Sequence, residues 1–214
     1  MHVSAIRIAY PMPPLAADVW PTRPSSQLLR AAVLMVLGSV FIAACAQISV
    51  PLWPVPVTGQ TFAVLTVGLA YGWRLGGATL ALYLAEGFVG LPVFANFSAG
   101  PAVFAGPTGG YLIGFVLAAA FAGCLAERGW DRRTPTTAAA MALSSSIILA
   151  CGVAWLSLYY AGPGSSYIST SGAQGVFGAA LATGFLPFVL GDVIKCGLAA
   201  LIMPLARKLA GRQG

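Results

Sequence analysis

Charge is scarce in this sequence. Charged residues make up 7% of the 214 residues, whereas 58% are hydrophobic, and the mean hydropathy is +0.86. Soluble domains carry about 25% charged residues, and a soluble chain this apolar could not cover its own surface. The composition therefore excludes a soluble protein and indicates an integral membrane protein.

Residues that support catalysis or metal binding are also few. His2 is the single histidine, and the four cysteines stand apart in apolar segments with no CxxC spacing. This pattern suggests neither a zinc site nor a disulfide framework, and HExxH, GxSxG and nucleotide-binding motifs are absent. We therefore expect no cofactor, no metal and no enzymatic activity, and the chain cannot hydrolyse ATP to drive transport.

Basic residues outnumber acidic residues, by eleven to five. They form no run with interleaved aromatic residues, so we expect no nucleic-acid partner. Instead they lie beside the hydrophobic segments, where Lys and Arg set the topology of a membrane protein.

Six hydrophobic segments follow a Pro-rich stretch of residues 1–26, which we expect to be a disordered tail without a signal peptide. The segments cover residues 28–49, 59–72, 75–90, 108–126, 136–160 and 175–206. Because about 20 apolar residues span a bilayer as a helix, we predict an all-α integral membrane protein, one domain of six transmembrane helices over residues 27–214. The second and third segments are short and separated by Arg74, so four spans plus a re-entrant pair are the alternative.

The placement of the basic residues predicts the orientation in the membrane. The loops on one side, residues 50–58, 91–107 and 161–174, contain no Lys or Arg. Ten of the eleven basic residues fall on the other side: Arg7, Arg23, Arg30, Arg74, Arg128, Arg132, Arg133, Arg207, Lys208 and Arg212. Because Lys and Arg concentrate in cytoplasmic loops, we predict that both termini are cytoplasmic.

The first two outer loops, VPLWPVPVT and LPVFANFSAGPAVFAGP, are apolar yet dense in Pro and Gly. Neither loop should be helical throughout. Irregular backbone near a membrane persists only where protein or a water-filled cavity shields it. We infer that these loops fold inward over a binding cavity on the outer side.

Lys195 is the basic residue that lies inside a predicted span, three residues after Asp192. A charge at bilayer depth costs about 2.5–3.5 kcal/mol on insertion scales, and residues at i and i+3 share a helix face. Either the two ions pair with each other for packing, or each meets a separate group of a ligand. Pro187 should kink this helix and free a carbonyl toward the cavity, which favours a ligand.

Four further polar residues are candidates for the same site. Asn96 offers a donor and an acceptor, or it structures its own loop. Gln60 either reaches the site or caps the following helix, and Glu86 lies in the cavity, in helix packing or at the interface. Tyr111 follows a Gly-rich turn at a helix start, which either holds an anion or is a tight turn that packs through small residues, and its hydroxyl can point into the site. Ser144–Ser146 fit polar helix packing.

One cation, one anion and several amides in an apolar pocket suit a small molecule with a carboxylate at one end and a neutral hydrogen-bonding head at the other. A solitary carrier or channel is compatible with this site. An intramembrane enzyme that uses Asp192 or Glu86 with Lys195 is the weakest alternative.

The motifs VTGQTF, GLPVFA, GPTGGYLIGF and GDVIK occur in this order within residues 28–206. Together they resemble the BioY family, the biotin-specific substrate-binding (S) components of energy-coupling factor (ECF) vitamin transporters. The resemblance implies six helices, a multi-pass location in the bacterial cytoplasmic (inner) membrane, and biotin as the substrate. It also implies partners, a transmembrane coupling protein and cytoplasmic ATP-binding subunits. We expect the lipid bilayer to be a further partner. The alternative function is a solitary membrane carrier for biotin or another small carboxylate vitamin, without ATPase partners.

The resemblance also assigns roles to the candidate residues. Asp192 and Asn96 would bind the ureido ring of biotin, and Lys195 would pair with the valerate carboxylate. Further positions of the site are Tyr111, Gln60 and Glu86. The VPVTG loop would act as a lid, and small residues at Ser39 and Ala43 would admit the coupling protein or pack within the chain itself.

Overall fold

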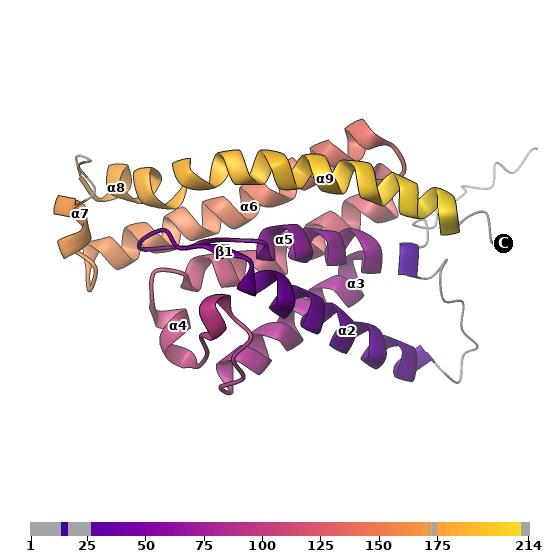
Figure 1. Cartoon of the computed structure of the whole chain (residues 1–214), viewed down its shortest axis with the longest axis horizontal. Coiled ribbons are helices and arrows are strands. Elements are labelled where there is room, and N and C mark those ends of the chain that lie inside the picture. The colour runs from indigo at the N-terminus through magenta and orange to yellow at the C-terminus, as the bar shows by residue number, and fades with distance from the viewer. Residues whose placement is uncertain (1–13, 17–26, 171, 173–174, 211–214) are drawn as a thin grey trace, which may run out of the picture.

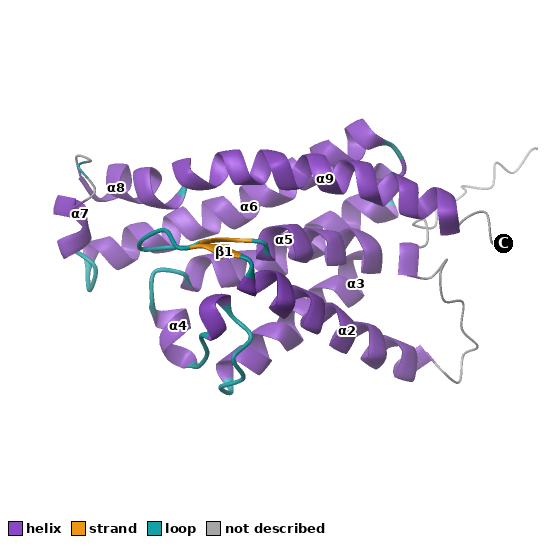
Figure 2. Cartoon of the chain, viewed as in Figure 1, coloured by secondary structure: helices purple, strands orange, loops and turns teal. Residues whose placement is uncertain are grey.

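The computed structural model describes residues 14–16, 27–170, 172 and 175–210. Most of these residues are helical (Figure 2). The α-helices are α2 (Gln27–Gln47), α3 (Gln60–Phe88), α4 (Pro101–Ala105), α5 (Gly109–Glu127), α6 (Thr134–Ala161), α7 (Ser166–Thr170), α8 (Gly175–Gly184) and α9 (Leu186–Ala210). Short 3-10 helices occur at η2 (Ala95–Phe97) and η3 (Trp130–Arg132), and strands β1 (Ser49–Val50) and β2 (Val57–Thr58) pair antiparallel.

Four helical stretches among the described residues are long and apolar enough to cross a membrane. They are Gln27–Gln47, Gly109–Glu127, Thr134–Ala161 and Gly175–Leu209. The prediction of an all-α membrane protein is confirmed at this level. The number of crossings depends on α3, which contains the second and third predicted segments.

Helix α3 doubles back on itself at Gly72. The backbone of Gly72 has φ 79° and ψ 173°, which is not helical. The side-chain Nε2 of Gln60 donates to the Tyr83 hydroxyl at 2.7 Å, although residues 23 apart in a straight helix would lie about 35 Å apart. A Cβ atom on Gly76 would also lie 3.1 Å from the Cα of Gly68. The two arms, residues 60–71 and 73–88, therefore form a helical hairpin, which turns close to the interruption at Arg74 between the two predicted segments.

Helix α5 occupies the centre of the molecule between α3 and α6, while α2 packs on α3 and α9 packs along α6 (Figure 1). Of the residues in the α5 span, 67% are buried, against 17% in α2. A Cβ atom on Gly123 of α5 would lie 2.3 Å from the backbone nitrogen of Trp73. Glycine at this position lets the hairpin turn of α3 approach the backbone of α5.

The two ends of the molecule differ in character. The short elements β1, α4, α7 and α8 gather at one end, and the start of α2 and the end of α9 lie at the other (Figure 1). At the second end, Arg207 of α9 donates from Nε to Asp131 Oδ2 at 2.6 Å, with Asp131 fully buried. From the sequence, Arg207 is predicted to be one of the basic residues that set the topology. The structure shows that it also forms a buried ion pair.

The last predicted segment, residues 175–206, is divided at Phe185 into α8 and α9. The break lies two residues before Pro187 and agrees with the predicted kink. The Phe188 N–H bonds the carbonyl of Phe185, so the Gly184 carbonyl loses its helical partner and accepts the Tyr111 hydroxyl at 2.7 Å. The freed carbonyl is therefore used by the protein itself.

Most of the predicted N-terminal tail, residues 1–13 and 17–26, lies outside the described residues. Within the described part, Ala16 is buried and its carbonyl accepts from the Arg30 guanidinium at 2.5 Å. Residues 14–16 thus contact the helical domain.

Candidate functional site

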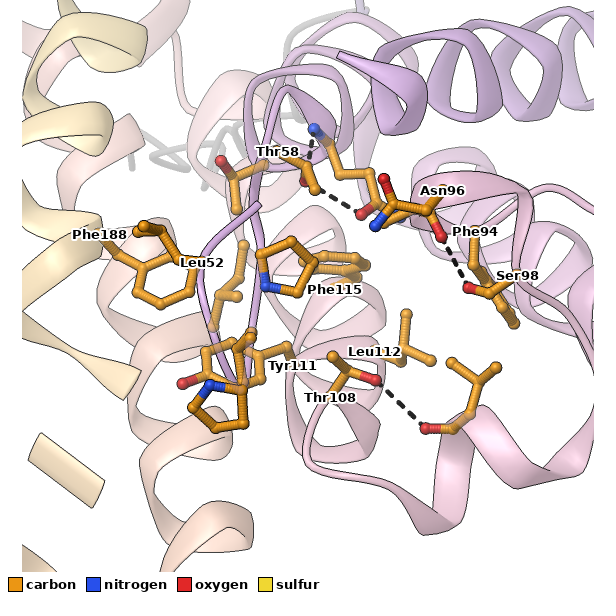
Figure 3. Close-up of a pocket in the computed structure, with 18 of the residues that line it drawn as sticks. Leu52, Thr58, Phe94, Asn96, Ser98, Thr108, Tyr111, Leu112, Phe115 and Phe188 are labelled. Atoms are coloured by element: carbon orange, nitrogen blue, oxygen red, sulfur yellow. Dashed lines mark hydrogen bonds between the residues drawn. The ribbon is translucent and has the colours of Figure 1, made fainter. Parts of the chain in front are cut away.

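A cavity of about 370 Å³ lies between the helices and the first two outer loops. Its apolar wall includes Tyr111 and Phe115 from α5 and Phe188 from α9 (Figure 3). The rings of Tyr111 and Phe188 are stacked with centroids 5.6 Å apart. Such a wall favours a ligand with a compact apolar body.

The first outer loop covers the cavity. Residues 51–56, which join β1 to β2, all line it. Trp53 in this loop meets Tyr167 of α7 edge-on, with ring centroids 5.5 Å apart. The irregular loop that the Pro-rich sequence predicts thus covers one side of the cavity, and α7 contacts this loop through Trp53.

Lys195 is the charged residue of the lining. Its Nζ donates to the Thr61 hydroxyl at 2.7 Å and lies 3.6 Å from Asp192 Oδ1. The second distance is an ion contact that is too long for a good hydrogen bond. Since an ammonium group has three N–H donors, Lys195 retains capacity for an anion in the cavity.

Asp192 lies behind Lys195 and does not appear in the cavity lining of the described residues. It is 8% exposed, and its Oδ2 accepts from the Ser145 hydroxyl at 2.5 Å. The structure therefore combines the two interpretations of the pair: the ions contact each other, and Lys195 also faces the cavity. Ser145 thus contacts the ion pair through Asp192, whereas the sequence predicts only polar helix packing for this serine.

Asn96 lines the cavity from η2, across from Phe188 (Figure 3). Its Oδ1 accepts from the Ser49 hydroxyl at 2.9 Å. With the side-chain oxygen bonded to the first loop, the side-chain NH₂ is the group that Asn96 can direct to a ligand.

Gln60 also lines the cavity, but its side chain is used within the protein. Its oxygen accepts from the Thr58 hydroxyl at 3.0 Å and its nitrogen donates to Tyr83, which in turn donates to the Val93 carbonyl at 2.9 Å. The N-cap residue of α3 is Gly59, and the hydroxyl of the preceding Thr58 accepts from the Gln60 backbone N–H at 3.2 Å. Gln60 thus links the first loop to the second.

Tyr111 and Glu86 differ in their position relative to the cavity. Tyr111 lines it with its ring, while its hydroxyl is bonded to Gly184. Glu86 does not appear in the lining of the described residues, and its carboxylate accepts from the buried hydroxyl of Ser39. Of the alternatives for Glu86, helix packing fits this contact, and Ser39 faces α3 within the chain.

The fold and the cavity define a helical membrane protein that encloses a site for a small solute. The chain belongs to the BioY family, whose model matches residues 17–212. The resemblance of its motifs to this family is therefore confirmed.

Curated relatives and a solved structure agree with this assignment. The biotin transporter BioY of Thermotoga maritima is 38% identical over 192 residues, covering 86% of this chain and 96% of the relative. The biotin transporter BioY of Rhizobium etli is 32% identical, covering 81% and 87%. A crystal structure of the S-component for biotin from an ECF-type ABC transporter shares the fold, with a TM-score of 0.68, 22% identity, and coverage of 87% of this chain and 95% of that one.

Proposed function

We propose that this chain captures biotin from the outer side of the membrane and serves in its uptake as the S component of an ECF transporter. Membership of the BioY family carries the proposal, since relatives that cover most of the chain are biotin transporters. The chain is a transporter subunit and not an enzyme. The cavity has the size and apolar lining of a site for one small molecule.

The geometry supports a defined orientation of biotin in the cavity. The carboxylate meets the Lys195 ammonium, and the Asn96 NH₂ donates to the ureido oxygen. The rings of Tyr111, Phe115 and Phe188 cover the apolar part of the ligand. The cavity thus has a polar group at each end and an apolar wall between them, which matches a ligand with two polar ends.

Three other residues of the predicted site act indirectly in this proposal. Asp192 holds the Lys195 ammonium in place through the 3.6 Å contact. Glu86 joins α2 to α3 through Ser39. Gln60 shapes the cavity through its bonds to Thr58 and Tyr83.

We further propose a six-helix topology with both termini in the cytoplasm of a bacterial cell. The two arms of α3 count as the second and third crossings, and α8 and α9 together as the sixth. The loops at the cavity end contain no Lys or Arg, and the charge pattern predicts that ten basic residues lie on the other side, which supports this orientation. A transmembrane coupling protein and ATP-binding subunits are the proposed partners.

Reconstitution into proteoliposomes tests the function directly. The chain alone should bind external biotin without accumulating it, because it has no nucleotide-binding motif of its own. Addition of the coupling protein and ATP-binding subunits with internal ATP should produce net uptake. The measurement is accumulation of radiolabelled biotin, with a hydrolysis-deficient ATP-binding subunit as the control. Net uptake by the chain alone would support the solitary carrier instead.

Loss of the contact between the loop and α7 should accelerate biotin release. An aromatic pair contributes about 0.5–1.5 kcal/mol, so Tyr167→Ala should raise the dissociation rate by roughly 2- to 10-fold. Chase of bound radiolabelled biotin measures this rate. Trp73→Ala, which alters an exposed tryptophan at the opposite end, should leave the rate unchanged. An unchanged rate in Tyr167→Ala would show that α7 does not hold the loop.

A further inference from the structure

Two consecutive residues beside the cavity have left-handed backbone conformations. Asn96 and Phe97 both have φ 55°, and neither is glycine. Such a conformation is uncommon for non-glycine residues and unusual for a bulky one. It persists only where surrounding contacts impose it, and such positions cluster at binding sites.

Gln47, the last residue of α2, supplies the contacts that hold this segment. Its Nε2 donates to the Phe94 carbonyl at 3.0 Å, and its Oε1 accepts from the Phe97 backbone N–H at 3.0 Å. One side-chain amide therefore bridges the residues on either side of Asn96. A second bond from Nε2 to the Ala43 carbonyl at 3.2 Å fixes the Gln47 side chain against its own helix.

Gln47 itself does not appear in the cavity lining of the described residues. Its effect on a ligand must therefore pass through the segment that it holds. The bridge requires a donor and an acceptor on one side chain, and glutamine has both. Glutamate offers only acceptors when ionised, and leucine has a similar shape with neither group.

We propose that Gln47 is a positioning residue of the biotin site, which fixes η2 so that the Asn96 NH₂ points to the ureido oxygen. This inference rests on the proposed function. It makes the end of α2 a determinant of selectivity for ligands whose head group has a carbonyl acceptor. The Ser49 hydroxyl assists by holding the Asn96 oxygen away from the ligand.

The test compares biotin with 2-iminobiotin, in which an imino group replaces the ureido oxygen. Gln47→Leu should weaken biotin binding about tenfold and reduce the preference for biotin over 2-iminobiotin. Gln47→Glu should lose less, since it retains the acceptor for the Phe97 N–H. Gln27→Leu changes an exposed glutamine at the other end of α2 and is the matched control, with no expected effect. Isothermal titration calorimetry of the purified full chain measures both ligands.

A double-mutant cycle with Asn96→Ala completes the test. If Gln47 acts through Asn96, the Gln47→Leu substitution should cost little further affinity in the Asn96→Ala background. Additive losses, or equal weakening of both ligands by Gln47→Leu, would overturn the inference and leave the proposed function intact. Failure of the wild-type chain to bind biotin would instead overturn the proposed function. If Gln47→Leu does not fold, Gln47→Glu is carried through the same cycle and judged in the same way.

Discussion

Lys195→Ala should weaken biotin binding by about a hundredfold. Loss of a hydrogen bond to a charged group costs about 1.5–3 kcal/mol, and the change also leaves the Asp192 carboxylate, 8% exposed, without its cation. Calorimetry on the detergent-purified chain measures the affinity. Lys208→Ala, which alters an exposed lysine of the same helix, is the matched control and should bind as the wild type does.

A neutral ligand analogue identifies the group that Lys195 meets. The wild type should bind biotin methyl ester more weakly than biotin, because the ester has no carboxylate. Lys195→Ala should bind the two ligands with similar affinity. If the variant loses the same factor for both, the ammonium meets the ureido end and the proposed orientation is reversed.

The internal ion pair can be tested separately from the ligand contact. The double variant Asp192→Asn with Lys195→Met removes both charges while it retains similar shapes. Replacement of a buried ion pair by neutral groups is often tolerated by the fold, so the variant should be stable and should bind biotin weakly. Biotin binding at wild-type strength would show that the pair serves packing alone.

The sequence predicts the residues of the site whose chemistry conflicts with their surroundings. Lys195 stands out because burial of an ion in an apolar membrane helix costs free energy, and the cavity loops stand out because Pro and Gly interrupt apolar segments. Asn96 also lies at the cavity. Each of these signals is local, so it can be read without knowing which helices are neighbours.

Contacts between segments that lie far apart in the sequence produce no comparable local pattern in the sequence. Ser145 reaches Asp192 across 47 residues, and Gln47 reaches Phe97 across 50. Serine and glutamine are ordinary residues in or near a membrane helix, so only the packing of the helices reveals their role. The same holds for Glu86, whose partner Ser39 lies on another helix and turns it away from the cavity.

The reversal within α3 can be predicted only in part from the sequence. The sequence has a short segment on either side of Arg74, which indicates an interruption without its geometry. The turn requires the positive φ of Gly72 and the close approach of Gly123 from α5. These glycines occur among many others in the chain, so their importance follows from tertiary structure.

Arg207→Met should lower the stability of the protein by about 3–5 kcal/mol at alkaline pH, because it leaves the buried Asp131 carboxylate without its guanidinium. Burial raises the pKa of the Asp131 carboxyl above its ordinary value, and Arg207 opposes that effect. Without Arg207 the pKa rises further. A group with a raised folded-state pKa stabilises the fold when protonated, and this contribution is lost as the pH rises through that pKa.

The destabilisation by Arg207→Met should therefore be larger at pH 8 than at pH 5. Thermal unfolding in detergent measures it, with an expected drop in the melting temperature on the order of 10 °C at pH 8. The double variant Asp131→Asn with Arg207→Met has no carboxyl to titrate and should show the same melting temperature shift at both pH values. Arg133→Met alters an exposed arginine directly after η3 and should change the melting temperature little. An equal drop for Arg207→Met at both pH values would mean that packing, and not the charge of Asp131, makes Arg207 necessary.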